Sequence, residues 1–384
     1  MLNKILKIMG IIVLFPVFFF VLSFGVNEQG EEVVAKQKRM ADRGLYITYY
    51  MSRTPSHFNY IKEQAQKSGL NTIVVDAKHI LGQPLVKLAK EKKLNFMTRV
   101  TPDPWLSRLT QELHKEGFIV SARLVVFKDD HLVIARPDLA IRIKGGELYR
   151  DHKQGRWADP YSDEVRLYNE LVAERAALSG VDEVQFDYIR FPAEGKAYLA
   201  YYPHEKEGVS KVDIITSFLK DTRNRISKYN VSIAVDIFGV TAWQERRADI
   251  ENLGQDVKRM AKYIDVLSPM FYPSHFHSGY DGFANPGSHP YHFISTGVKK
   301  TIAVLSGEAV TIVPWIQGFN LRSPNFGPNY IQEQIKACQD LGVERYLVWN
   351  AANNYGTTFA ALKEGKVTVK DQENKVNRSP DLDL

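Results

Sequence analysis

Strand-like apolar runs alternate eight times with amphipathic helical stretches along this chain, and this alternation limits the possible folds more than any other feature. It predicts successive β–α units whose strands lie parallel in one sheet. The eight expected strands are 44–51, 70–77, 118–127, 181–189, 231–238, 264–271, 310–316 and 344–350. Eight such units predict a closed (β/α)8 TIM barrel, which the 384 residues can accommodate with insertions. A doubly wound open sheet is the alternative, but no glycine-rich phosphate loop follows the first strand.

Turn residues and helix patterns support the same organisation. The clearest expected helices are 55–68, 162–179, 211–228 and 329–341. Gly69, Gly180 and Gly342 each stand between such a helix and the next strand, as a C-terminal cap residue does. Two long insertions, 83–105 after strand two and 128–161 after strand three, are expected to wall a cleft, because loops after strands form the catalytic face of such a barrel.

The N-terminal segment indicates export. Lys4 and Lys7 precede an apolar run, 8–26, that contains no charged residue and approaches the length needed to span a bilayer. Residues 1–27 are therefore expected to be a cleaved signal peptide or an uncleaved membrane anchor, with the remainder outside the cytoplasm. Segment 28–43 is a polar, helix-compatible spacer, 44–365 the barrel domain, and 366–384 a charged tail expected to be disordered.

Charge and cysteine content narrow the possible partners. The net charge of +6 comes from 50 basic residues scattered among 44 acidic ones. The sequence therefore shows no basic cluster of the kind that binds nucleic acids. Cys338 is the only cysteine, so an intrachain disulfide and a thiolate metal cluster are excluded. His275 and His277 have an H-x-H spacing without a third ligand of clear position. We therefore expect neither a metal nor a cofactor.

The fourth expected strand, within VDEVQFDYIRFP, carries polar residues on one face. Alternate side chains of a strand share a face, so Glu183, Gln185 and Asp187 point away from the apolar residues between them. Buried polar groups need partners, so this face predicts a functional site. Alternatively, the segment is an edge strand whose polar face is exposed to solvent. Asp236, in VSIAVDIFG, has the same inward parity.

The ends of the strands form a predicted polar ring around a shared pocket. Asp187 and Asp236 are its candidate catalytic residues, and neighbouring strands about 4.8 Å apart would give them a separation that glycosidases use. The candidate substrate-binding residues are Asp76, Arg123, Arg190, Tyr272, Trp315, Gln317 and Asn350. Alternatively, one or both aspartates are held in structural ion pairs with Arg123 or Arg190.

Four segments in order, FKDDHLVIARPDLAI, WADPYSDEVRLYN, VDEVQFDYIRFP and YIDVLSPMFYPS, resemble a bacterial family of glycoside hydrolases also called domain of unknown function 4015. The resemblance spans nearly all of the barrel and implies carbohydrate hydrolysis, with Asp187 as the catalytic candidate. A more distant comparison is with family-18 chitinases. There, Gln185 and Ile189 replace the middle aspartate and the glutamate of the D-x-x-D-x-D-x-E strand, so the chitinase mechanism does not transfer.

The preferred hypothesis is a hydrolase of an extracellular or cell-envelope polysaccharide. Asp187 would be its nucleophile or base and Asp236 its general acid, and the two roles could be exchanged. A non-catalytic carbohydrate-binding barrel is the alternative, because Gln317 stands where many barrel glycosidases have a glutamate. A third hypothesis, deacetylation or metal-assisted lysis, rests only on the histidines after strand six.

Overall fold

The computed structural model describes residues 24–26, 32–34, 38–97 and 99–363. The chain divides into two units, Met1–Gln37 and Lys38–Leu384. In the first unit, β1 (Phe24–Val26) and β2 (Glu32–Val34) pair antiparallel, so three residues of the helix-compatible spacer form a strand. Most of the predicted membrane-targeting run and the predicted disordered tail lie outside the described residues. No helix in the described ranges is long and apolar enough to cross a membrane.

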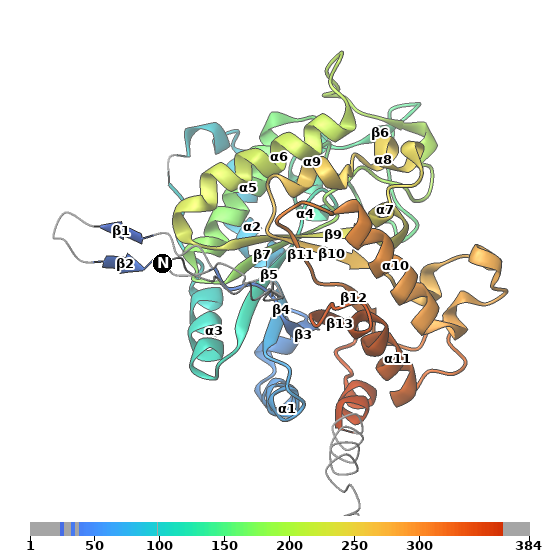
Figure 1. The fold of residues 1–384 in the computed structure, drawn as a ribbon. Coiled ribbons are helices and arrows are strands. Elements are labelled where there is room, and N and C mark those ends of the chain that lie inside the picture. Colours follow the sequence, from blue (N-terminus) through green and yellow to red (C-terminus); the bar gives the residue numbers. More distant parts are fainter. Residues whose placement is uncertain (1–23, 27–31, 35–37, 98, 364–384) are drawn as a thin grey trace, which may run out of the picture. The chain divides into compact units, whose positions relative to one another are not determined.

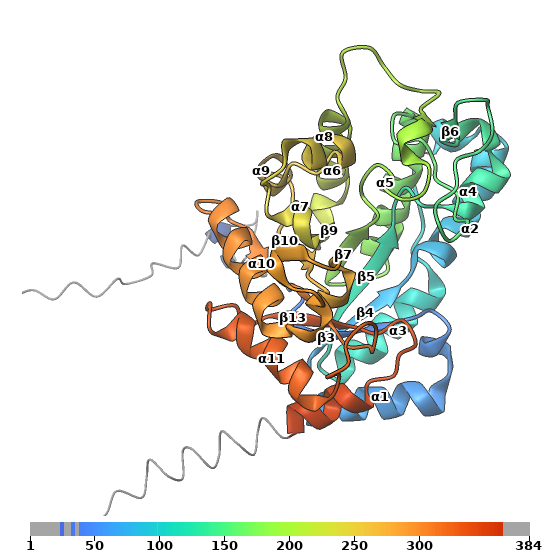
Figure 2. The same ribbon diagram turned by 90° about the vertical axis from the view of Figure 1, so that its right-hand side faces the viewer.

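The second unit contains the predicted (β/α)8 barrel, seen from two directions in Figures 1 and 2. Its strands are β3 (Arg43–Ile47), β4 (Thr72–Asp76), β5 (Ile119–Val125), β7 (Glu183–Asp187), β9 (Ser232–Phe238), β10 (Val266–Met270), β11 (Thr311–Ile312) with β12 (Trp315–Gln317), and β13 (Tyr346–Trp349). Neighbouring strands pair in parallel, and β13 pairs with β3 to close the barrel. All eight expected strands are thus present: the observed strands are mostly shorter than predicted, none extends more than one residue beyond its predicted range, and the seventh is split into β11 and β12.

Helices surround the strands in Figure 2. The longer ones are α1 (Pro55–Lys67), α2 (Lys78–Lys90), α3 (Pro104–Lys115), α5 (Asp163–Leu178), α6 (Lys211–Ile226), α10 (Pro290–Val304) and α11 (Pro328–Gln339). The shorter ones are α4 (Asp130–Ala135), α7 (Gly239–Ala242), α8 (Arg247–Leu253) and α9 (Val257–Ala261). Local sequence sets several beginnings. Ser210 and Asp213 form a capping box at α6, and Asp103 caps α3 just before Pro104.

The two insertions after β4 and β5 differ from each other in structure. Residues 83–90 belong to α2, whose Leu81, Leu85 and Ala89 recur at four-residue intervals and are buried. This apolar stripe packs α2 against α4 and α5. The insertion after β5 forms β6 (Arg142–Ile143), which pairs antiparallel with β8 (Ala200–Tyr201) from the loop after β7. This loop and the insertion are therefore joined by backbone hydrogen bonds.

The amino ends of the strands are covered by the residues that precede β3. The Ala41 backbone N–H donates to Glu183 at 3.0 Å, and Arg39 forms an ion pair with Asp182 at 3.1 Å. Residues 38–43 therefore belong to the barrel unit, and the predicted spacer ends earlier than expected. Glu183 is fully buried there, and burial raises its pKa from 4.5 to about 7.

Candidate active site

A cleft of about 1000 Å³ opens at the carboxyl ends of the strands. Most of its lining comes from strand ends and from the loops that follow β7, β9 and β10. The insertion after β5 contributes Lys153, whereas no residue of 83–105 lines the cleft. Both candidate aspartates, Asp187 and Asp236, line it, as the sequence predicted.

Asp187, the last residue of β7, is held by three N–H donors. Its Oδ2 accepts hydrogen bonds from Arg123, from Nε at 3.1 Å and from Nη2, and its Oδ1 accepts the Tyr188 backbone N–H at 2.6 Å. Tyr188 has a φ of +51°, in the left-handed region, where the chain leaves the strand. Side chain and backbone together stabilise negative charge on Asp187, as a nucleophile or base requires.

Arg123 lies at the centre of an ion-pair cluster. It also binds Asp76, which accepts the Tyr46 hydroxyl on its other oxygen. The guanidinium lies 4.9 Å from the centre of the Trp349 ring and 5.5 Å from that of Tyr46. Burial alone would lower the pKa of Arg123, but the carboxylates of Asp76 and Asp187 outweigh it and raise that pKa. Asp76 is not among the lining residues, so its contacts point to holding Arg123 rather than substrate.

Asp236 is buried in surroundings that favour the protonated form of its carboxyl. In the β7–β9 register Phe186 lies opposite Val235, so Asp187 and Asp236 follow at the same level on neighbouring strands. Burial, and then the Asp187 charge, raises the pKa of Asp236 well above its ordinary value. Its Oδ1 accepts hydrogen bonds from Gln185 Nε2 at 2.9 Å and Trp315 Nε1 at 2.8 Å. Both N–H donors bind Oδ1, so a proton on this carboxyl would be carried by Oδ2.

Arg190 has a different partner from the expected one. Its Nη2 lies 2.5 Å from Glu194, and its guanidinium lies 4.2 Å from the ring centre of Phe238. The acid paired with Arg190 is therefore Glu194, which is not among the residues predicted for the site, rather than Asp187 or Asp236. The four-residue spacing was the available signal, yet spacing has no fixed geometrical meaning in a loop. Arg190 and Asp187 form no ion pair, and within the described residues Arg123 is the cation that contacts this aspartate.

The structure separates the other candidate binding residues into two groups. Tyr272 and Trp315 line the cleft. Gln317 accepts the Ser274 backbone N–H at 3.1 Å and donates to the Phe319 carbonyl at 2.9 Å. Asn350 donates to the carbonyls of Gly318 and Asn354, both at 2.7 Å. Neither amide is among the lining residues, and both tie loops together behind the cleft.

The loop after β10, which contains the two histidines of the H-x-H motif, forms part of the cleft wall. His275 and His277 both line the cleft, and His275 Nδ1 lies 3.2 Å from Ser274 Oγ. Among the described residues there is no group of three or more His, Cys, Asp and Glu side chains placed to hold a metal ion. The loop therefore offers polar contacts to a ligand without forming a chelating set.

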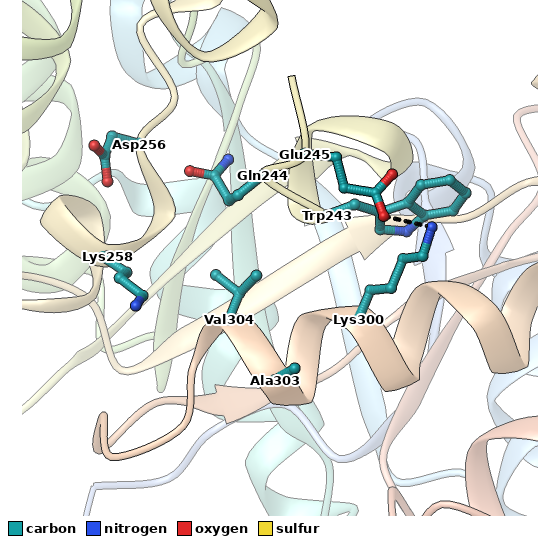
Figure 3. Close-up of a pocket in the computed structure, with 8 residues that line it drawn as sticks. All are labelled: Trp243, Gln244, Glu245, Asp256, Lys258, Lys300, Ala303 and Val304. Carbon is teal, nitrogen blue, oxygen red and sulfur yellow. Dashed lines mark ion pairs between the residues drawn. The ribbon is translucent and has the colours of Figure 1, made fainter. Parts of the chain in front are cut away.

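Figure 3 shows a second, smaller hollow of about 530 Å³ between the loop after β9 and α10. Its Glu245 and Lys300 form an ion pair at 2.7 Å, and Lys300 lies 4.1 Å from the ring centre of Trp243. The Gln244 amide nitrogen donates to the carbonyls of Thr241 and Gln255. Neither candidate aspartate lines this hollow, whereas both line the larger cleft.

Comparison with known proteins agrees with this geometry. The model of a family described as "Putative glycosyl hydrolase domain" matches residues 44–355. The glycoside hydrolase domain of PgaB (BpsB) from Bordetella bronchiseptica is 12% identical with a TM-score of 0.55, over 85% of this chain and 98% of that one. The β-galactosidase from the psychrophilic Marinomonas ef1 is 12% identical with a TM-score of 0.57, over 88% and 61%.

The catalytic domain of the β-amylase from Paenibacillus polymyxa is 10% identical with a TM-score of 0.51, over 81% of this chain and 92% of that one. At these identities the three structures support the shared barrel fold. A search of curated proteins finds no match.

Proposed function

The chain belongs to the glycosyl hydrolase family whose model covers residues 44–355, and we propose that it cleaves an extracytoplasmic or cell-envelope polysaccharide with Asp187 and Asp236 as its carboxylate pair. The observation that carries this proposal is the contrast between the two acids. Asp187 forms an ion pair with Arg123, whereas burial and the Asp187 charge raise the pKa of Asp236, at the same level of one cleft. Environments that separate two carboxyl groups in this way assign them different catalytic roles.

The register favours a retaining mechanism. Neighbouring strands are about 4.8 Å apart, and two carboxyl groups at one level of adjacent strands match the roughly 5 Å separation of retaining glycosidases. Asp187 would attack the anomeric carbon while Asp236 Oδ2 protonates the leaving glycosidic oxygen. Asp236 would then accept a proton from the water that hydrolyses the glycosyl-enzyme ester and releases Asp187.

The exchanged assignment is less favourable. Asp187 would have to carry a proton beside the Arg123 guanidinium, which stabilises its charged form. Asp236 would have to ionise in a buried position next to another anion. Both changes oppose the local electrostatics.

The proposed location rests on the N-terminal sequence. Residues 1–27 combine Lys4 and Lys7 with the uncharged apolar run that follows, which is typical of a signal peptide or anchor. Fractionation of cells that express the whole chain tests this, since recovery in the cytoplasmic fraction would contradict export.

Sugar release from a panel of envelope glycans tests the activity. Wild type should generate new reducing ends from at least one glycan, and Asp187→Asn should generate almost none. Unchanged turnover in the variant would remove Asp187 from the mechanism.

The competing function is carbohydrate binding without cleavage. It is favoured by the end of β12, which presents Gln317 rather than a carboxylate. Calorimetric binding of a glycan that is never hydrolysed would support it, and formation of reducing ends from that glycan would exclude it.

A further inference from the structure

The cleft extends beyond the two aspartates toward the loop that follows β7. At about 1000 Å³ it is at the upper limit of the roughly 300–1,000 Å³ of small-molecule pockets. Its lining includes Ala193, Ala197 and Tyr198 of this loop. A ligand that filled the cleft would therefore reach from the catalytic carboxyls to the loop.

Hydrogen bonds fix the loop at both of its ends. The Gly195 backbone N–H donates to His152 at 3.0 Å, and the Tyr149 hydroxyl donates to the Glu194 carbonyl. At the other end, the Lys144 N–H donates to the Leu199 carbonyl at 3.2 Å, and β8 pairs with β6. At the first of these ends the backbone of Gly195 also lies close to that of Arg150, because a Cβ on Gly195 would lie 3.1 Å from the Arg150 carbonyl oxygen.

Tyr198 lies between these two fixed ends and is 81% exposed. Among the large apolar side chains exposed in the described part of the chain, only Tyr198 and Val240 line the cleft. The aromatic side chains on the cleft floor, such as Tyr272 and Trp315, are buried. Tyr198 thus offers a free ring on a fixed support, at the rim of the same cleft.

We propose that Tyr198 forms an outer subsite, where its ring stacks on a sugar unit several units away from the bond that is cleaved, so that the substrate is a polysaccharide chain rather than a small glycoside. The inference rests on the proposed glycan-cleaving function. A sugar ring has an apolar C–H face, and a tyrosine offers a large flat area with few rotatable bonds. Because the loop is already fixed, stacking would require little additional ordering.

Affinity as a function of chain length tests the subsite. Binding is measured by calorimetry in the full chain with Asp187→Asn, so that no ligand is consumed. The probes are hexasaccharides and disaccharides of β-1,4-glucose, β-1,4-mannose, β-1,4-N-acetylglucosamine and α-1,4-glucose. Tyr201, which is 54% exposed in the same loop but does not line the cleft, provides the matched control.

Adding Tyr198→Ala should weaken binding of the preferred hexasaccharide about tenfold, as loss of one stacked aromatic contact predicts, and should leave disaccharide affinity within about twofold. Adding Tyr201→Ala should change neither. Equal loss on both lengths, or no loss on the hexasaccharide, would overturn the inference, as would a chain that binds none of the probes. Length-dependent binding that requires Tyr198, with no cleavage by the wild type, would keep the subsite and reject the proposed hydrolysis.

Discussion

The two ends of strand β7 carry chemically similar carboxyl groups in opposite environments. Glu183, at the amino end, is covered by residues before β3 and accepts hydrogen bonds from Ala41 N–H and Ser121 Oγ, and no cation among the described residues forms an ion pair with it. Asp187, at the carboxyl end, faces the cleft and is bound by Arg123. Both are nearly inaccessible to solvent, at 0% and 6% exposure.

The difference shows that burial alone does not identify a catalytic acid. Glu183 satisfies its hydrogen-bonding needs with groups of the protein, and its pKa rises because no cation offsets burial. Asp187 has a guanidinium partner, an acidic neighbour with a raised pKa, and access to a ligand. A functional role follows from this combination of a charge partner, a second acid and an open cleft.

The largest expected effect is on kcat, and it distinguishes the carboxyl groups at the two ends of β7. Asp187→Asn should lower kcat by about 10³-fold or more, because it removes the charge that acts on the anomeric carbon. Glu183→Gln should keep kcat within about threefold of wild type, since Glu183 does not line the cleft. Steady-state kinetics on the cleaved glycan, with circular dichroism to confirm folding, measures both. Equal losses in the two variants would refute the contrast.

The next effect concerns the pH dependence set by Asp236. Its raised pKa favours the protonated acid, so kcat/KM should fall as pH rises through that pKa and the acid loses its proton. Asp236→Asn should lower kcat at neutral pH by about 10²- to 10³-fold and remove this alkaline decline. A pH–rate profile of both proteins is the measurement. An unchanged alkaline limb in the variant would assign it to another group.

The third expected effect is on stability, and it concerns Glu183 at the amino end of β7. The folded-state pKa of Glu183 is about 7 against an ordinary value of 4.5, so the folded state favours its neutral form. The associated stability is fully present below about pH 4.5 and is lost as pH rises through about 7, in total about 3 kcal/mol. Glu183→Gln should therefore gain stability relative to wild type across this window. Urea unfolding from pH 5 to 8.5 measures it, and a pH-independent difference would contradict this pKa.

The smallest effect on activity is expected at Gln317, behind the cleft. Gln317→Ala should reduce the free energy of unfolding by about 2 kcal/mol, because the buried Ser274 N–H loses its acceptor. KM should remain within about twofold of wild type. Thermal unfolding and kinetics test this together. A tenfold rise in KM with unchanged stability would instead support the predicted role of Gln317 in substrate binding.

Much of the fold follows from short-range pattern in the sequence. The eight strands were found because apolar runs and turn glycines recur locally, and the inward parity of Gln185, Asp187 and Asp236 follows from the two-residue period of a strand. The predicted insertion 83–105 does not line the cleft, and its residues 83–90 continue helix α2, as the four-residue spacing of Leu81, Leu85 and Ala89 indicates. For this segment, the spacing of apolar residues indicates the structure better than the length of the segment does.

The ion-pair and hydrogen-bond partners of the site residues could not be predicted from local sequence pattern. Arg123 and Arg190 were both expected near Asp187, but β5 lies beside β7 and delivers Arg123, whereas the turn after β7 sends Arg190 to Glu194. The donors to Asp236, Gln185 and Trp315, come from β7 and β12, which lie far apart in the sequence. Such contacts depend on strand order and loop path, on which local spacing has little bearing.

The sequence by itself determined which residues form strands and which side chains point inward, because both depend on neighbours only a few positions away. It therefore placed Glu183, Gln185 and Asp187 on one inner face. Only the tertiary structure decided that the segment before β3 closes the Glu183 end, that Arg123 and Asp236 meet Asp187 at the other end, and that Gln317 and Asn350 bind loops. The physical reason is that hydrogen bonds, desolvation and charge pairing act between groups brought together by closure of the barrel.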